Sequence, residues 1–154
     1  MNQGPAIKGN PLKISVYLLL LCYIMGEFFL PKYPLLYPIN LIGIIVLISS
    51  LFLFFSGFNI FKSYKEDPRP KSYSINLIKT GIFAYTRNPI YLSFILFHFS
   101  MFLIFENIAY LLTTFGIAIW IHYYVIKPEE NYLLKKFSDD YKNYMRSVSR
   151  WIFF

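Results

Sequence analysis

The chain has 154 residues, of which 56% are apolar and 21% aromatic, while only 15% are charged. A soluble domain of this length carries about 25% charged residues, so the composition excludes most soluble folds and favours a single membrane domain over residues 1–154. The net charge of +7 does not point to nucleic acid, because the basic residues follow the pattern of a membrane protein described below.

The apolar residues gather in four runs, which are residues 14–30, 39–61, 89–105 and 108–126. Each run is close to or above the length of about 20 residues that a helix needs to cross a bilayer. Inside a bilayer every backbone polar group must be bonded within its own segment, so we expect helices. The predicted fold is therefore an all-α integral membrane protein with four transmembrane helices, preceded by a short polar lead.

The basic residues predict the orientation of these helices. Of the 15 Lys and Arg residues, only Lys32 lies between the first and second runs, and none lies between the third and fourth. All others fall in residues 1–13, 62–88 and 127–154. The positive-inside rule then places both termini in the cytoplasm, with the protein in the inner membrane of a bacterium or the endoplasmic reticulum of a eukaryote.

A cytosolic amphipathic helix is predicted after Pro128, over residues 129–146. Its apolar positions follow helical spacing: Tyr132, Leu133, Phe137, Tyr141 and Tyr144. Only two residues join the last two runs, so these should form a tight antiparallel hairpin. The segments 62–88 and 127–154 should then converge on one membrane face, where they would cover a site with Asn88 near Glu129.

The segment before the third run carries features suited to ligand binding. Gly81 permits a tight turn, and Pro89 suits the first turn of a helix. The free N–H groups of that turn would favour an anion such as a ligand carboxylate, and Arg87 adds a fork of donors. The alternative is an ordinary helix start with an arginine that reaches toward water.

Acidic and histidine residues supply the other candidates. Glu129 and Glu130 stand in a basic region, where they either complement a helix dipole or bind a ligand. His98 and His122 either line a cavity or pack within the bundle. Two histidines in different helices do not make a convincing metal site, and none is predicted.

The segment 81–91, followed by Glu129-Glu130-x-x-Leu133-x-x-x-Phe137-x-x-x-Tyr141-x-x-Tyr144, resembles the isoprenylcysteine carboxyl methyltransferase family. That family belongs to a wider group that includes membrane phospholipid methyltransferases. The resemblance covers about residues 72–152 and rests on two motifs in order and at the family's spacing.

The resemblance implies S-adenosylmethionine as methyl donor and a pocket between the last two spans and the C-terminal helix, open sideways to lipid. The cofactor-binding residues it implies are Ile75, Asn76, Leu77, Ile78, Phe83, Arg87, Asn88, Pro89, Tyr91 and Glu129. The same motif puts Glu130 on the neighbouring helical face, so Glu130 should matter less to the cofactor. His98 and Lys127 are the candidates for the substrate. The substrate would be a lipophilic, membrane-embedded molecule resembling a prenylcysteine carboxylate or a phospholipid.

Three positions depart from the family pattern. Asn88 replaces a histidine, Ser138 replaces a glycine, and Val125 stands where prenylcysteine enzymes place a substrate-binding arginine. Asparagine cannot titrate, which argues against proton transfer at that position. Two other functions stay open: a membrane reductase that uses NADPH on a sterol-like lipid, and a non-catalytic membrane scaffold. Catalytic residues and the oligomeric state are not predicted.

Overall fold

The computed structural model describes residues 4–32 and 34–152, and in this part of the chain it is all-helical apart from loops and one isolated bridge between Lys32 and Asn107. The helices, in chain order, are α1 (Pro11–Phe28), α2 (Tyr37–Ser63), the short 3₁₀ helix η1 (Gly81–Ala84), α3 (Pro89–Phe105), α4 (Ile108–Ile121), the π-helix η2 (His122–Ile126) and α5 (Lys127–Ser147).

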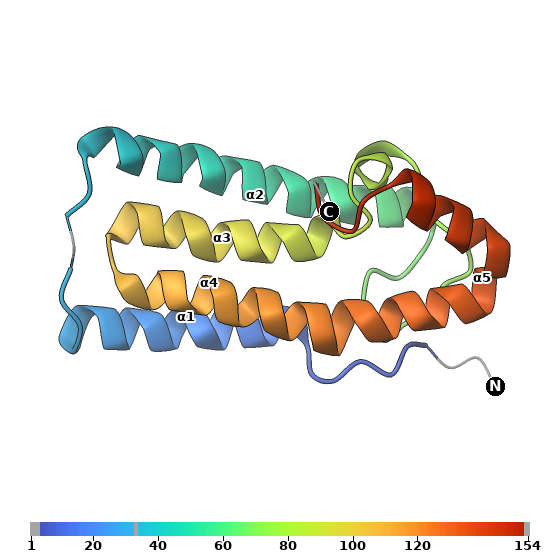
Figure 1. Ribbon diagram of the computed structural model, residues 1–154, viewed down its shortest axis with the longest axis horizontal. Helices are drawn as coiled ribbons and strands as arrows, with labels where there is room; N and C mark the ends of the chain where they lie inside the picture. The colour runs from blue at the N-terminus through green and yellow to red at the C-terminus, as the bar shows by residue number, and fades with distance from the viewer. Residues whose placement is uncertain (1–3, 33, 153–154) are drawn as a thin grey trace.

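The long helices run roughly parallel or antiparallel in one bundle (Figure 1). α2 packs along α3, α3 against α4, and α4 against α1. The connection between α1 and α2 and the turn between α3 and α4 lie at one end of the bundle. α5, the loop after α2 and the C-terminal segment gather at the opposite end, as the sequence predicts.

Each of the four predicted apolar runs forms a helix. Three helices are long and apolar enough to cross a membrane, namely α1, α2 and the helix that begins at Ile108, while α3 is apolar but shorter. The first helix begins at Pro11 rather than residue 14, because the Asn10 side chain accepts hydrogen bonds from the backbone N–H groups of Leu12 and Lys13. The expected tight turn at residues 106–107 is confirmed.

The separate C-terminal helix expected to begin at residue 129 is not separate. α4, η2 and α5 follow one another without a break, and Pro128 lies in the first turn of α5. A proline inside a helix deprives the carbonyl four residues earlier of its partner, and here that carbonyl belongs to Tyr124. Tyr124 instead accepts a hydrogen bond from the backbone N–H of Lys8 at 3.3 Å, so the N-terminal segment and the π-helical turn together accommodate the proline.

α5 bends sharply at Ser138, whose φ of 45° and ψ of −114° are not helical. The bend turns the second half of the helix back toward the start of α3 (Figure 1). Tyr141 and Tyr144 are buried there, and the Tyr144 hydroxyl donates a hydrogen bond to the Phe83 carbonyl at 2.6 Å. This bend positions the C-terminal segment beside the start of α3.

The N-terminal segment before α1 is more than a polar lead. The Ile7 side chain is buried in the core cluster that contains Tyr91 and Val125. Gly4 lies so close to the backbone of Lys71 that an added Cβ would overlap the carbonyl oxygen. The segment therefore packs across the same end of the bundle as α5.

Candidate functional site

A cavity lies at the end of the bundle where α5 and the loops gather. It is bounded by the start of α3, the start of α5, the loop between α2 and η1, and Pro5 of the N-terminal segment. The two segments that the sequence predicts to meet therefore do meet, and Asn88 and Glu129 both line the cavity although about forty residues separate them.

The loop wall of the cavity is held by Glu66. The Glu66 carboxylate accepts hydrogen bonds from the backbone N–H of Ile75 at 3.0 Å and from the side-chain amide of Asn76 at 2.9 Å. Asn76, Leu77 and Ile78 line the cavity, whereas the Ile75 side chain is exposed. The role of Glu66 was not predicted from the sequence. The signal that could have indicated it is the pair Glu66-Asp67, which are the only acidic residues in the otherwise basic segment 62–88.

The chain enters α3 through a turn that only a few residue types fit. Gly81 has a φ of +59°, in the left-handed region that favours glycine, and its Cα lies close to the Ile60 side chain. The η1 turn then places the Phe83 ring edge-on against Phe61, with centroids 5.7 Å apart. Pro89 occupies the first turn of α3, as predicted.

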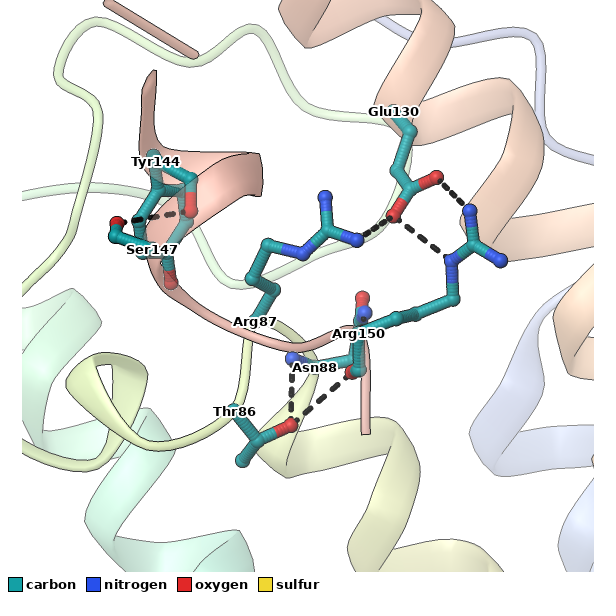
Figure 2. Close-up of polar contacts among 7 residues, drawn as sticks. All are labelled: Thr86, Arg87, Asn88, Glu130, Tyr144, Ser147 and Arg150. Carbon is teal, nitrogen blue, oxygen red and sulfur yellow. Dashed lines mark hydrogen bonds and ion pairs between the residues drawn. The ribbon is translucent and has the colours of Figure 1, made fainter. Parts of the chain in front are cut away.

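The C-terminal segment runs beside the residues that precede α3 (Figure 2). The backbone N–H of Arg87 donates to the Ser149 carbonyl at 3.0 Å. The Arg150 carbonyl accepts hydrogen bonds from the Thr86 hydroxyl at 3.1 Å and from the Asn88 amide at 3.0 Å. The Asn88 side chain therefore helps to hold the C-terminal segment in place. The resemblance assigned Asn88 to the cofactor and did not predict this structural role.

Glu129 and Tyr91 face each other across the cavity. The Tyr91 hydroxyl donates a hydrogen bond to the Glu129 carboxylate at 2.8 Å. Burial raises the pKa of Glu129 to about 7; the Tyr91 hydrogen bond opposes this rise and the neighbouring Glu130 charge adds to it. Glu129 can therefore hold or lose a proton near neutral pH.

Glu130 lies between two arginines, which approach its carboxylate from opposite sides (Figure 2). Arg150 donates through Nε to Oε1 at 3.0 Å and through Nη2 to Oε2 at 2.7 Å. Arg87 approaches Oε1 through Nη2 at 3.2 Å. The side chains of Glu130 and Arg87 are only 8% and 7% exposed, so this charge cluster is largely removed from water.

The predicted substrate residues lie elsewhere. His98 is fully buried within the bundle, where Nε2 contacts the Ser15 hydroxyl at 2.9 Å and Nδ1 contacts the Thr113 hydroxyl at 3.2 Å. It thereby links α1, α3 and α4. Lys127 is exposed, with Nζ 4.4 Å from the centre of the Tyr123 ring. Neither of these two residues is among those that line the cavity.

Val125, at the position of the family's substrate-binding arginine, is fully buried in the apolar core and offers no polar group to a ligand. Within residues 4–32 and 34–152, no group of three or more His, Cys, Asp or Glu residues is placed to hold a metal ion. The groups available to a cofactor are thus the carboxyl of Glu129, the guanidinium of Arg87, the hydroxyl of Tyr91 and the loop at residues 76–78.

Comparison with known proteins identifies a family. The family model described as phospholipid methyltransferase matches residues 39–140. The match takes in nearly all of α2, the loop, α3, α4 and about the first two thirds of α5, and it includes most of the residues that line the cavity. A search among curated proteins gives no match.

Proposed function

We infer that this chain, which belongs to the phospholipid methyltransferase family, uses S-adenosylmethionine to methylate a lipophilic, membrane-embedded acceptor. Membership of the family makes it a membrane methyltransferase, in agreement with its apolar helices. The methyl donor, the acceptor and the residues that bind them are our proposal. The acceptor resembles either a phospholipid or a prenylcysteine carboxylate.

The observation that carries the proposal is the contrast in charge within the cavity. Glu130 is bound by two arginines, whereas Glu129 makes no ion pair with any residue of the described chain. A partly buried carboxyl without a fixed cation suits a ligand that brings its own positive charge. S-adenosylmethionine does so, with a sulfonium and an ammonium group.

The proposed cofactor site combines the Glu129 carboxyl with residues that would contact the uncharged parts of the methyl donor. Glu129 would balance the positive charge of the donor, with Tyr91 holding its carboxylate in place. The backbone at residues 75–78, fixed by Glu66, would contact the remainder of the donor together with Phe83, Asn88 and Pro89. Bound S-adenosylmethionine would supply an electrophilic methyl group, so the protein need only align the acceptor and exclude water.

An amine acceptor would have to lose a proton before it could attack the methyl group. The sequence offers no evident base, but Glu129 lies at the cavity and has a pKa near neutrality. Its ionised form could take that proton. A carboxylate acceptor needs no base, so a requirement for ionised Glu129 beyond donor binding would favour an amine.

The acceptor is proposed to reach the cavity from the bilayer. Tyr91 lines the cavity from the first turn of α3, at the end of an apolar helix. A lipid at that depth could present its polar head to the methyl donor and leave its tail in the membrane. Each buried CH₂ contributes about 0.8 kcal/mol, so tail length should govern apparent affinity.

The proposed topology has four spans and both termini in the cytoplasm, which places the cavity on the cytoplasmic side. The basis is the distribution of Lys and Arg, of which only Lys32 lies at the other end. Cysteines introduced at residues 2 and 154, in a Cys22→Ala background, test the orientation. Labelling of either position in intact cells by a membrane-impermeant reagent would contradict it.

The experiment that tests the function is a titration of the purified protein with S-adenosylmethionine and, separately, with NADPH. We expect saturable binding of the former, followed by transfer of a radiolabelled methyl group to acceptors that share one head group and carry tails of increasing length. Binding of NADPH alone would indicate a reductase, and binding of neither would indicate a scaffold. Equal turnover of a tailless acceptor would overturn access from the bilayer.

A further inference from the structure

The cluster around Glu130 contains one more positive charge than negative charge. Two guanidinium groups share a single carboxylate, and they share it unequally. Arg150 uses two donors on both carboxylate oxygens, at 3.0 and 2.7 Å. Arg87 has only the 3.2 Å contact, on an oxygen that Arg150 already occupies.

The remaining donors of Arg87 are unsatisfied. Its Nε and Nη1 atoms are buried and have no hydrogen-bond partner within the described chain. Buried polar groups are nearly always paired, because an unpaired one loses its hydration without replacement. Arg87 is among the residues that line the cavity, so a ligand bound there is the candidate partner for these donors.

A second feature at the same place favours a negative charge. α3 begins at Pro89, and its first residues, Pro89, Ile90 and Tyr91, line the cavity. The Asn88 side chain makes no capping hydrogen bond to the helix, and its amide group instead donates to the Arg150 carbonyl. The start of α3, with the positive end of its helix dipole, therefore lies at the cavity beside Arg87.

We propose that Arg150 is a positioning residue that keeps Arg87 open for an oxyanion on a ligand, with the first turn of α3 as the second half of this anion subsite. The inference rests on the proposed function. Two ligands could supply the oxyanion: the phosphodiester of a lipid acceptor or the carboxylate of the methyl donor. Both match the planar donor fork of an arginine.

Arg150 can hold Glu130 because its own backbone is fixed. Its carbonyl accepts hydrogen bonds from Thr86 and Asn88, which flank Arg87 in the chain. The C-terminal segment thus brings a competing guanidinium to Glu130 from outside the cavity (Figure 2). Without Arg150, Glu130 would be free to form a two-bond pair with Arg87 and so satisfy the donors that otherwise face a ligand.

The depth of Arg87 favours the phosphodiester. Arg87 lies two residues before an apolar helix that begins at Pro89. In the proposed topology this is the level at which the hydrocarbon of the bilayer gives way to the head groups. A lipid that moves sideways to the cavity would keep its phosphate at that level.

The test compares ligands that carry an oxyanion with related ligands that lack it. One arm measures binding of S-adenosylhomocysteine and of its decarboxylated analogue. The other measures binding of phosphatidylethanolamine in micelles and of a long-chain primary amine without phosphate. In the parent protein, loss of the oxyanion should weaken binding by about tenfold or more in at least one arm. In Arg87→Gln that ratio should fall close to one in the same arm.

Variants at Arg150 separate positioning from general support of the fold. Arg150→Gln should reduce the ratio in that arm several-fold, because Glu130 then pairs with Arg87. The double variant Glu130→Gln/Arg150→Gln should restore it, because Arg87 loses its internal competitor. Arg146→Gln, which removes an exposed arginine from the end of α5, is the matched control and should leave the ratio unchanged.

The outcomes separate the claims. A ratio that responds only in the phosphatidylethanolamine arm assigns the subsite to the acceptor. A response only in the S-adenosylhomocysteine arm assigns it to the donor and overturns the argument from depth. Ligands that bind without discrimination, or an Arg150→Gln loss that the double variant does not restore, overturn the subsite and the positioning role respectively. Absence of any binding to the parent instead counts against the proposed function.

Discussion

Glu129 and Glu130 follow each other in the first turn of α5, and both line the same cavity, yet their partners differ in kind. Glu130 is bound by Arg87 and Arg150, so its charge is balanced within the protein. Among the residues that the structure describes, Glu129 has only the hydroxyl of Tyr91 as a side-chain partner, and burial raises the pKa of Glu129 to about 7. One carboxylate therefore completes the fold, while the other is available to a mobile cation.

The structure also bears on the interpretation that the acidic pair only complements a helix dipole. Carboxylates that only complement a helix dipole would lie at a free helix start. α5 continues directly from η2, so its first turn is not free, and the side chains of both glutamates are engaged by partners from other parts of the chain. We conclude that tertiary contacts, rather than the dipole, account for this pair.

The largest effect is expected for Glu130→Ala. Removing this carboxylate leaves the buried Arg87 without a counter-charge and releases Arg150, which should lower the free energy of unfolding by about 3 kcal/mol or more. Glu129→Ala should change it far less, because no fixed charge loses its partner. Denaturant-induced unfolding in detergent measures both. Equal destabilisation by the two substitutions would contradict the difference in structural role between Glu130 and Glu129.

For binding of the methyl donor, the larger effect is expected from Glu129→Ala rather than from Glu130→Ala. Glu129→Ala should weaken binding of S-adenosylmethionine by roughly tenfold or more, since a lost hydrogen bond to a charged group costs about 1.5–3 kcal/mol. Isothermal titration calorimetry measures the change. Asp139→Ala is the matched control, because Asp139 lies on the same helix with its side chain 86% exposed. If Glu129→Ala binds like the parent, the pocket assignment is wrong.

The pH dependence of binding sharpens the assignment to Glu129. A carboxyl with a pKa of about 7 is mostly neutral at about pH 6 and mostly ionised at about pH 8. A cationic donor prefers the ionised form, so its affinity should rise with pH through about 7 and then level off, by up to about tenfold in all. Glu129→Gln should abolish this rise in affinity with pH, because glutamine does not titrate.

Tyr91→Phe supplies a second check on the same curve. The Tyr91 hydrogen bond stabilises the ionised form of Glu129, so its loss should raise the pKa of Glu129. The rise in affinity should then occur at higher pH than in the parent protein. An unchanged midpoint would mean that another group titrates.

The smallest effect is expected at Ser138, where the family pattern has glycine. Its φ of 45° strains any residue with a side chain, so Ser138→Gly should stabilise the protein by about 1 kcal/mol. The bend brings the C-terminal segment to Glu130 but does not contact Glu129, so affinity for S-adenosylmethionine should stay unchanged. If Ser138→Gly lowers the free energy of unfolding, the backbone at Ser138 is not strained as proposed.

The sequence predicted more of the helices than of their contacts. All four apolar runs form helices, and the two-residue turn between α3 and α4 correctly placed the start of α3 beside the end of α4. Gly81 and Pro89 adopt the conformations that their residue types suggest. That the four helices cross a membrane, with both termini in the cytoplasm, stays a prediction.

What the sequence determined by itself are the local properties of this protein. Apolar runs, prolines and the two-residue turn fix where helices form, because backbone hydrogen bonds in a helix join residues only a few positions apart. The same two-residue turn also predicted which polar segments meet. The continuation of the helix through Pro128 depends instead on a tertiary contact. The carbonyl that loses its helical partner at the proline accepts a hydrogen bond from Lys8, more than a hundred residues earlier in the chain.

Only the tertiary structure showed why the two adjacent glutamates differ in their partners. Arg87 and Arg150 reach Glu130 because the bend at Ser138 returns the chain to the start of α3, and no spacing in the sequence predicts that path. The same holds for His98, which a helical pattern places near the site and which instead links three helices. Ion pairs and buried polar contacts depend on distances between side chains far apart in sequence, and packing alone sets those distances.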